Sequence, residues 1–369
     1  MSEYFKHDPA VFAVDKYYQI MMPCEKACLF FVKVGDKVYY DESNGIMCSR
    51  NTIHKVKVPA ADLDRAKEYT VCIRPIIKRK AYFSKTRSVV ERVYEFYPVP
   101  ESNVRAYHIA DAHSNVEEPI RAAEAFGTID FLILNGDVIE DSSDPTKFMN
   151  IYEICSRLTG GAKPTIFSRG NHDLRGNYAE KFCDYTPTHL GNTYYSFRIG
   201  NIWGILLDCG EDKTDDHAEY GWTVACHCFR ERQTDFLKEI IENKEKEYAS
   251  EGVKHRLVIS HNAFVHRYSP PFDIEQDIFA EWSRLLRENV KPDVMICGHA
   301  HELNVYYPEN TEWNTNGSLC PVVIGSKIKK DKPVYFAGCG YVFGDEKIEI
   351  VFTDSNGETV RTEELPLAR

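Results

Sequence analysis

The chain has 369 residues, 43% of them hydrophobic and 27% charged, and its formal net charge is −11 at pH 7. A chain of this length can bury a substantial core and usually forms two domains. The acidic balance counts against a general nucleic-acid binder, because such proteins usually present a basic surface. We therefore expect no nucleic-acid partner.

The sequence carries no mark of a membrane segment or an export route. No apolar run approaches the ~20 residues that span a bilayer. Met1 to Asp15 shows no basic flank that leads into an apolar stretch, so no signal peptide is visible. The twelve cysteines are then expected to be reduced thiols. We expect a cytoplasmic protein without membrane contact.

Short segments rich in β-branched and aromatic residues fill the first hundred residues, and turn residues separate them. Gly35-Asp36 and Asn44-Gly45 are hairpin-type turn signals. Several short strands at this spacing predict a smaller all-β sandwich domain over residues 1–99, and residues 98–102 are typical of a linker. The predicted strands are residues 17–21, 28–34, 37–40, 52–58, 69–77 and 90–96.

Past this linker, strand-like apolar runs alternate with segments whose apolar residues recur at three- and four-residue spacing. Such alternation predicts an α/β layered domain over residues 103–369. The predicted helices are residues 117–126, 148–158, 233–248 and 278–288, and the tail adds predicted strands at residues 321–324, 333–336 and 347–352.

Five short polar motifs in this domain each follow an apolar run that is typical of a buried strand. In open α/β sheets, sites are built in the crevice beyond the carboxyl ends of the strands. Two aspartates, one asparagine and four histidines arrive there together, which indicates one dinuclear metal site. The motifs are Asp111-Ala112-His113, Gly136-Asp137, Gly170-Asn171-His172-Asp173, Ser260-His261 and Gly298-His299-Ala300-His301, after predicted strands at 104–109, 131–134, 165–167, 257–259 and 294–297.

The residue types indicate which ions would bind there. Aspartate oxygen and neutral imidazole suit divalent or trivalent ions of intermediate softness, such as manganese, iron and zinc. A carboxylate can bridge two ions, and two ions about 3.5–4 Å apart can share a hydroxide that forms near neutral pH. None of the seven candidate ligands is a cysteine, which argues against a closed structural zinc site.

The ordered set D-x-H, G-D, G-N-H-D, H and G-H-x-H resembles the calcineurin-like metallophosphoesterase superfamily, from about residue 103 to the C-terminus. The pattern is most similar to the cyclic-nucleotide phosphodiesterase type and to uncharacterised bacterial phosphoesterases. The resemblance implies a β-sandwich core flanked by helices. It also implies an enzyme that hydrolyses a small phosphomonoester or phosphodiester by attack of a metal-bridging hydroxide, with manganese or iron as the most expected ions.

The resemblance further implies a role for each of the seven candidate ligands. One ion would be held by Asp111, His113 and His301, the other by Asn171, His261 and His299, and Asp137 would bridge the two.

His172 would bind no metal in this assignment and would instead assist the leaving group, while Asn171 would contact substrate as well as metal. Three residues after the bridging aspartate, purple acid phosphatases carry a tyrosine, and serine/threonine protein phosphatases carry an aspartate followed by Arg-Gly. This chain has Glu140 there and matches neither. By analogy with the protein phosphatases, we expect the Glu140 carboxylate to orient the His172 imidazole.

Two interpretations stay open for Arg169 and Arg175, which flank the G-N-H-D motif: an ordinary surface charge, or phosphate recognition by a planar guanidinium. Arg175 is the stronger candidate for binding substrate.

The long polar and aromatic segment 209–230 is typical of a lid or binding loop. Cys226 and Cys228 within it are not expected to form a second metal site, because we find no further cysteine pair at zinc spacing.

Two other functions stay open as well. A catalytically silent scaffold of the same fold would typically have lost ligands, whereas this chain retains them, and a nuclease of the same superfamily would need a basic groove. The first hundred residues resemble the fibronectin-type-III-like domain that precedes the catalytic domain in some metallophosphoesterases. That domain would contact a protein or glycan, or buttress the rim of the active site.

Overall fold

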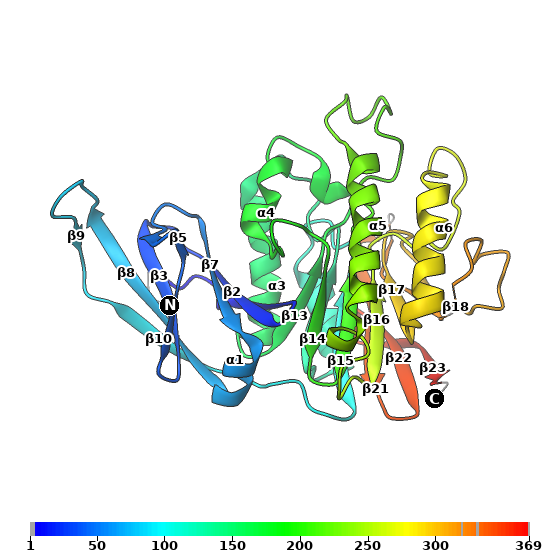
Figure 1. The fold of residues 1–369 in the computed structure, drawn as a ribbon, viewed down its shortest axis with the longest axis horizontal. Coiled ribbons are helices and arrows are strands. Elements are labelled where there is room, and N and C mark those ends of the chain that lie inside the picture. The colour runs from blue at the N-terminus through cyan, green and yellow to red at the C-terminus, as the bar shows by residue number, and fades with distance from the viewer. Residues whose placement is uncertain (1–3, 319, 330–331, 368–369) are drawn as a thin grey trace.

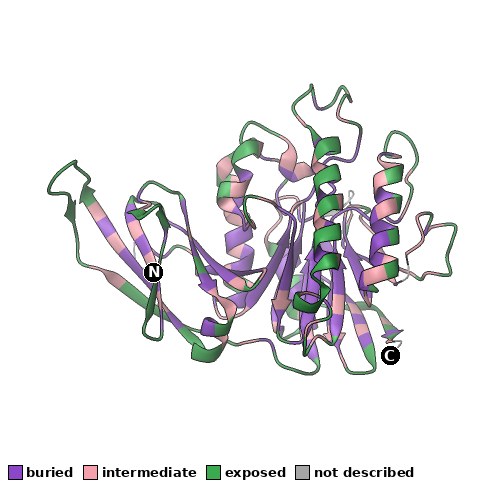
Figure 2. Ribbon diagram, in the orientation of Figure 1, coloured by how far each residue is buried: buried purple, intermediate pink, exposed green. Residues whose placement is uncertain are grey.

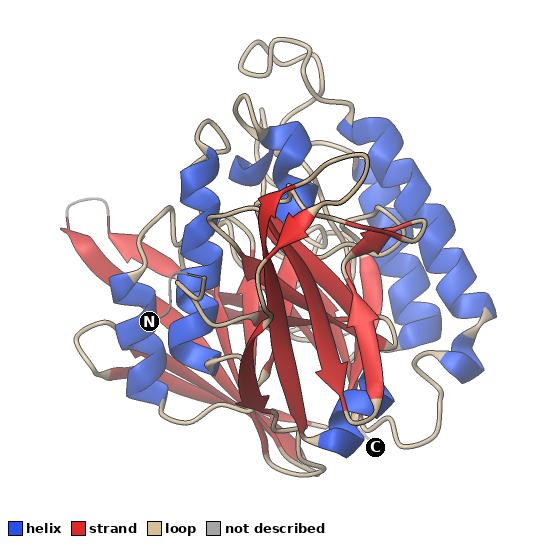
Figure 3. Ribbon diagram, turned by 90° about the vertical axis from the view of Figure 1, so that its left-hand side faces the viewer, coloured by secondary structure: helices blue, strands red, loops and turns tan. Residues whose placement is uncertain are grey.

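Two stacked β-sheets form the centre of the molecule in the computed structural model, and helices cover their outer faces (Figure 1, Figure 3). The structure describes residues 4–318, 320–329 and 332–367. This arrangement of α/β layers is the predicted fold class. The predicted helix at 117–126 and the predicted strands at 104–109 and 294–297 have the bounds of α2 (Glu117–Phe126), β11 (Val104–Ile109) and β17 (Val294–Cys297).

The larger sheet has ten strands. Its spatial order is β23 (Thr359–Pro366), β22 (Lys347–Asp354), β21 (Lys332–Phe343), β11, β12 (Phe131–Asn135), β13 (Pro164–Ser168), β1 (Ala10–Val14), β2 (Tyr17–Pro23) and β7 (Ile53–Pro59), and β20 (Lys327–Lys329) pairs with β21. The strands from β11 to β1 in this order are parallel, whereas β21 and β2 pair antiparallel on either side of them.

The second central sheet has six strands. Its order is β14 (Tyr195–Ile199), β15 (Ile202–Leu206), β16 (His255–Ile259), β17, β19 (Val322–Gly325) and β18 (Leu303–Tyr306). The four strands in the middle of this sheet are parallel, and an antiparallel strand closes each edge.

Apolar side chains from both sheets fill the space between them. Ile109 and Ile133 of the larger sheet share one buried cluster with Ile259 and Ile296 of the six-stranded sheet. All five residues of β12 are buried, which is typical of a parallel strand that is covered on both faces. Each apolar side chain of β12 stabilises the folded state by about 1.5–3 kcal/mol because it leaves water. Figure 2 shows that burial is concentrated in these central strands.

The helices cover the outer faces with their apolar sides. α2 and α3 (Met149–Thr159) pack on the larger sheet, and α5 (Cys226–Glu242) and α6 (Gln276–Leu285) cover the six-stranded sheet. Two short helices, α1 (Ala60–Ala66) and α4 (Phe182–Tyr185), lie in connections. In the part of the chain that the structure describes, no helix combines the length and the apolar character needed to cross a bilayer.

The first hundred residues are rich in β-structure, and the six predicted strands appear with ends that differ by at most two residues. These strands divide between two sheets, however. β1, β2 and β7 join the ten-stranded sheet because β1 pairs in parallel with β13, Val11 lying opposite Pro164 and Phe12 opposite Thr165. A separate five-stranded sheet contains β3 (Cys28–Val34), β4 (Lys37–Tyr40), β8 (Glu68–Lys78), β9 (Lys85–Thr86) and β10 (Val90–Glu95).

This division bears on two predictions. The resemblance to a fibronectin-type-III-like domain is not confirmed, since strands of that segment complete a sheet of the following domain. The boundary at residues 99–103 stays a prediction. A small hairpin of β5 (Glu42–Ser43) and β6 (Ile46–Met47) completes the N-terminal segment.

α5 is the helix that departs most from its prediction, because it begins seven residues before the predicted start at residue 233. Its first free N–H groups, those of Cys226 and His227, donate to the carboxylate of Asp215 at 2.9 and 3.1 Å. An acidic acceptor at a helix N-terminus satisfies unpaired donors and complements the helix dipole. The cap lies eleven residues upstream, beyond the reach of a local start signal.

Candidate metal centre

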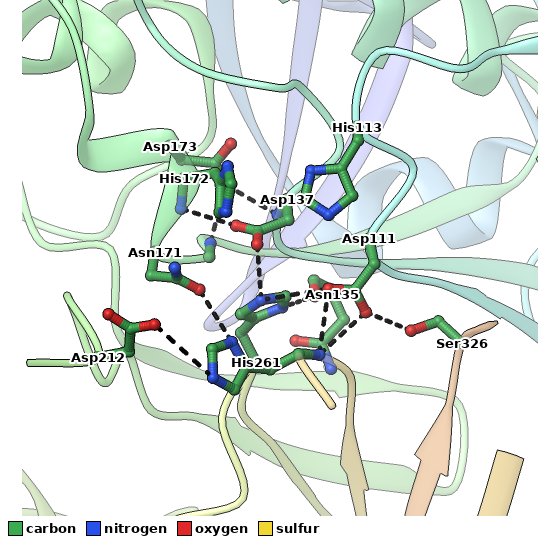
Figure 4. A network of polar contacts seen from close by, with 12 residues as sticks. Asp111, His113, Asn135, Asp137, Asn171, His172, Asp173, Asp212, His261 and Ser326 are labelled. Carbon is green, nitrogen blue, oxygen red and sulfur yellow. Dashed lines mark hydrogen bonds and ion pairs between the residues drawn. The ribbon is translucent and has the colours of Figure 1, made fainter. Parts of the chain in front are cut away.

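Five strand ends meet at one edge of the two stacked sheets. β11, β12 and β13 are neighbours in the larger sheet, and β16 and β17 are neighbours in the six-stranded sheet. One polar motif follows each of these strands, as predicted. Figure 4 shows that candidate ligands from both sheets, among them Asp111, Asp137 and His261, point toward one another.

A first group of ligand atoms comes from Asp111, His113 and His301. These atoms all lie within 4.8 Å of one another. Nε2 of His113 faces Nε2 of His301 at 3.2 Å, and the latter atom lies 3.3 Å from Oδ1 of Asp111. Two ring nitrogens and a carboxylate oxygen in this arrangement can share a proton or a single cation.

A second group comes from Asp137, His261 and His299, whose ligand atoms also lie within 4.8 Å of one another. Nε2 of His261 is 3.1 Å from Oδ2 of Asp137, and Nδ1 of His299 is 3.1 Å from Oδ1 of Asn171. The structure thus brings all seven predicted ligands together. Nε2 of His261 also lies 3.7 Å from Oδ1 of Asp111, so the two groups adjoin. The assignment of each ligand to one ion, and the bridging role of Asp137, stay predictions.

The tautomer of His261 tests whether this pocket fits a metal. Nδ1 of its buried ring is 2.7 Å from the carbonyl oxygen of Asn135, and because a carbonyl only accepts, Nδ1 carries the proton. Nε2 is buried and faces Oδ2 of Asp137 at 3.1 Å, on the side of the ring that is turned toward the other candidate ligands. Metal-binding histidines typically donate their second N–H to a carbonyl or carboxylate in this way. The pocket therefore fits a metal ion at Nε2.

The backbone at these ligands is unusual. Asp111, His113, Asp137, His299 and His301 all have positive φ, between +46° and +65°. Such values are uncommon for residues other than glycine, cost free energy, and cluster at functional sites. The backbone turns sharply at each strand end, so that the side chain points back into the site.

Gly136, directly before Asp137, also allows a sharp turn of the backbone. Gly136 has φ of +79°, and a Cβ atom there would lie 2.5 Å from Nδ1 of His261 and 2.6 Å from Cα of Gly170. A larger residue would push apart the strand ends that carry both ligand groups. The glycine of this motif is therefore required by close approach as well as by conformation.

The electrostatics of the pocket favour a cation. Burial would lower the pKa of His261, but the carboxylates of Asp137 and Asp111 raise it to about 10, so that without a bound ion this ring itself carries the positive charge that the carboxylates attract. Burial would raise the pKa of Asp137, whereas His261 lowers it to about 2. Burial lowers the pKa of His299 to about 4, so this imidazole is neutral at pH 7. Ionised carboxylates and a neutral imidazole are the forms that bind a metal ion.

His172 is held by the main chain and by a neighbouring ring. Its Nδ1 donates to the main-chain carbonyl of Glu140 at 2.8 Å, and its ring packs edge-on against His113, with 4.7 Å between centroids. The Glu140 carboxylate lies 3.3 Å from Nδ1 of His113 through its Oε2, and one ligand atom from each of His113, Glu140 and His172 lies within 4.8 Å of the others. The main-chain carbonyl of Glu140, rather than its carboxylate, makes the hydrogen bond to the His172 ring. The role of the Glu140 carboxylate in orienting His172 stays a prediction.

The comparisons with known proteins bear on this geometry. Residues 104–303 match the model of the calcineurin-like phosphoesterase family. The protein belongs to this family. A search of curated proteins finds no match.

Three solved structures are similar to this chain to different degrees. A purple acid phosphatase from yellow lupin (Lupinus luteus) seeds superposes with a TM-score of 0.62 at 12% identity, over 98% of this chain and 74% of the other. A predicted phosphoesterase from Streptococcus pneumoniae (TM-score 0.34, 11% identity) and a Vps29 mutant from Entamoeba histolytica (0.33, 11%) each match 72% of this chain, and 98% and 100% of their own. The lupin enzyme shares the fold, and its match includes the N-terminal strands.

Three further residues hold the candidate ligands or their loops by hydrogen bonds. None of the three is among the ligands predicted from the sequence. The Oγ of Ser326 and the main-chain N–H of His299 both donate to Oδ2 of Asp111, the latter at 2.9 Å. The carboxylate of Asp173 accepts the N–H of Gly170 at 2.8 Å, and Asn135 supplies the carbonyl for His261. Ser326 directly follows β19, so it lies at a strand end like the predicted ligands. That position in the sequence could have identified it.

Arg175 is held by acidic side chains of segment 209–230. Its Nε and Nη2 donate to the two carboxylate oxygens of buried Glu211 at 2.9 and 2.8 Å, and Nη1 lies 3.4 Å from the carboxylate of Glu219. Nη1 also lies 3.4 Å from Nε2 of His172. Arg175 thus connects the segment to the metal centre, and its predicted contact with substrate stays a prediction.

Segment 209–230 itself lies at the metal centre. Oδ2 of Asp212 is 4.0 Å from Nε2 of His299, and its Oδ1 accepts from the hydroxyl of Tyr220 at 2.8 Å. Cys226 is buried and accepts the N–H of Glu211, whereas Cys228 is exposed. The segment adds an acidic wall beside the second ligand group.

Arg169, the other arginine beside the G-N-H-D motif, is largely buried. Its Nε donates to the buried carboxylate of Asp208 at 2.7 Å, which also accepts from the hydroxyl of Thr193 at 2.6 Å. The surface-charge interpretation is therefore wrong for Arg169, and its guanidinium is paired within the protein.

Proposed function

We propose that this calcineurin-like phosphoesterase is a hydrolase of phosphate monoesters or diesters that uses two metal ions. The observation that carries the proposal is the pair of adjacent ligand groups, in which buried Nε2 of His261 faces the Asp137 carboxylate at 3.1 Å. In this proposal Asp111, His113 and His301 would hold one ion, and Asn171, His261 and His299 would hold the other. Asp137 would serve both. When bound, such ions supply the attacking hydroxide near neutral pH and neutralise charge on the phosphoryl oxygens.

His172 assists departure of the alcohol. Because Nδ1 donates to the Glu140 carbonyl, the ring presents Nε2 to the space beside the ligand groups. A proton on Nε2 passes to the leaving oxygen, and the ring stays fixed while the charge changes. Help of this kind is typically worth about 10²–10⁴-fold in rate.

A cavity of about 460 Å³ lies on the Arg175 side of His172 and suits the leaving group. Arg175, Glu211, Glu219 and Tyr220 contribute to its walls. Arg175 joins the cavity to Nε2 of His172 at 3.4 Å. The alcohol part of a small phosphoester would enter this cavity while its phosphoryl group faces the ligand groups. The acidic walls disfavour a highly anionic leaving group such as a polyphosphate.

A hydrolysis screen tests the proposal. Purified protein with added manganese is offered bis-p-nitrophenyl phosphate, p-nitrophenyl phosphate and natural nucleotides. We expect turnover of at least one of these substrates, its loss on chelation and its return with manganese. Protein that binds two ions and hydrolyses none of them would instead be a scaffold of the same fold.

Asp137→Asn is the decisive variant, because Asp137 is the residue assigned to both ions. Asparagine tolerates the left-handed backbone of this position but lacks the charge. We predict that the variant binds far less metal and has almost no activity. Asp141→Asn is the matched control, since Asp141 pairs with Lys147 at 2.7 Å and has no assigned ligand role. Two ions still bound to Asp137→Asn, by elemental analysis, would refute the bridging role.

A further inference from the structure

A second set of metal-binding side chains lies in the N-terminal segment, outside the active site. Cys24, Cys28 and His54 are all buried, with exposed fractions of 5%, 0% and 0%. One ligand atom from each lies within 4.8 Å of the others. Sγ of Cys28 is 3.3 Å from Nε2 of His54. Around a tetrahedral zinc ion, neighbouring sulfur and nitrogen ligands lie about 3.5–3.8 Å apart.

The ring of His54 is fixed in the orientation that a metal ligand needs. Its Nδ1 lies 2.6 Å from Oδ2 of Asp41, a carboxylate that is itself buried. The ring of Phe30 stacks on it with 5.4 Å between centroids and 16° between planes. A carboxylate on the far nitrogen of a metal-binding histidine fixes the tautomer and raises the basicity of the near nitrogen. Nε2 is thereby directed at Cys28.

The donor set selects the class of ion. Two thiols and one imidazole are soft and borderline ligands, which suit zinc rather than magnesium or calcium. Among the groups of three ligand atoms that the described residues form, this is the only one that contains cysteine. The spacing Cys24-x₃-Cys28 falls within the range of zinc sites. The expectation that the chain has no further cysteine pair at zinc spacing is therefore wrong.

The three residues come from two different sheets. Cys24 directly follows β2 and His54 lies in β7, both of the ten-stranded sheet, whereas Cys28 begins β3 of the five-stranded sheet. Asp41 follows β4 of that same five-stranded sheet. Any ion bound by this set would join the two sheets across their packed faces.

We propose that Cys24, Cys28 and His54 bind a zinc ion that fastens the five-stranded sheet to the ten-stranded sheet, with Asp41 orienting His54. Three protein ligands leave the fourth tetrahedral position of the ion to a further donor. The site joins two sheets, and it is independent of the proposed hydrolase function.

Cobalt substitution tests the site directly. Thiolate bound to cobalt(II) gives a charge-transfer absorption in the near ultraviolet, and the active-site ligands include no cysteine, so this band reports on the proposed site alone. We expect the band in the full chain and in Asp137→Asn. It should be absent from Cys28→Ser. Cys72→Ser is the matched control: Cys72 is a buried cysteine of the same sheet whose sulfur faces Thr70 and Glu91, and its loss should leave the band intact.

Zinc analysis gives the same answer by a second route. Cys28→Ser should lose one equivalent of zinc relative to Cys72→Ser. Asp41→Asn keeps all three ligands and should bind zinc about 10–100-fold more weakly, as second-sphere changes typically do. Absence of the cobalt–thiolate band from the reduced full chain would overturn the proposal, and so would a Cys24–Cys28 disulfide in freshly isolated protein. Neither result would depend on whether the protein hydrolyses a phosphoester.

Discussion

A single main-chain contact fixes the ring of His172. The carbonyl of Glu140 accepts from Nδ1 at 2.8 Å, and the edge of the ring lies against His113. The accepting atom belongs to the main chain of the loop that follows Asp137, so the orientation of His172 depends on the path of that loop. Substituting the Glu140 side chain leaves this oxygen in place. The chemistry assigned to His172 is therefore separable from metal binding.

His172→Ala should keep both ions, because His172 is assigned to neither, and should lose about 10²–10⁴-fold in turnover of substrates with poor leaving groups. The loss should be smaller for p-nitrophenyl esters, since nitrophenolate departs with little protonation. Rates for a series of leaving groups, with metal content measured alongside, check this. Equal losses across the series would remove the acid role from His172.

Glu140→Gln should leave turnover within about a factor of two, because the contact that holds His172 comes from the main chain and general acid help is lost only if that ring moves. The side chain is half exposed and an amide can still accept near Nδ1 of His113. Steady-state rates with a poor leaving group give the measurement. A large loss would show that the carboxylate acts on the ring despite its position.

The candidate ligands could be predicted because their signal is local: each follows an apolar strand directly, and strand ends of a layered sheet meet in space. The contacts that a side chain makes do not depend on its sequence neighbours alone. Glu140 and Ser326 owe their contacts to packing between segments far apart in the chain, Ser326 reaching Asp111 across 215 positions.

Among the connecting segments, 209–230 is held to the metal centre by charge. Glu211 is fully buried, and its bidentate partner is Arg175, whose side chain is 24% exposed. Removing one partner of a buried pair leaves an uncompensated charge in a poorly solvated place. This pair, together with the acidic cap of α5 by Asp215, orders a segment that has little regular structure of its own.

Arg175→Ala should lower the free energy of unfolding by about 3 kcal/mol, the lower end for a broken buried pair because the arginine is partly exposed. Arg284→Ala is the control, since its partners Glu281 and Glu288 lie on an exposed helix face and such pairs contribute little. Denaturant unfolding of both variants gives the comparison. A similar small effect in both would mean that segment 209–230 is ordered by other contacts.

Strands were easier to predict than their partners. The alternating segments of the N-terminal part have clear turns around them, so their bounds are close to those observed. The partner of β1 is a different matter. Its five buried residues, Ala10–Val14, pair not only with the neighbouring β2 but also with a strand 153 positions away, Val11 lying opposite Pro164. Such pairing follows from the assembled core rather than from any neighbouring residue.

The two central sheets contribute ligands to the same site, so metal binding should stabilise the complete fold. Asp111, Asp137 and Asn171 follow strands of the larger sheet, and His261 and His299 follow strands of the other. An ion that binds only the folded protein adds about 2.7 kcal/mol at a hundred times its Kd. For a chain of 369 residues, this corresponds to a rise of roughly 3–4 °C in the melting temperature for each ion.

Thermal unfolding with and without manganese measures this rise, and Asp137→Asn, which should bind little manganese at this site, should show almost none of it. An equal rise in that variant would place the stabilising ion elsewhere. The comparison therefore assigns the effect to the ligands that both sheets supply.

The pairing of β1 with β13 has a last consequence, for self-association. β13 leads into the G-N-H-D motif, and without β1 its main-chain donors and acceptors would line an open, apolar border. Open borders of this kind recruit strands from other molecules and seed aggregates. The N-terminal hundred residues thus cover an edge of the ten-stranded sheet. A fragment that lacked them would expose the edge of β13 next to the candidate metal centre and would be prone to aggregate.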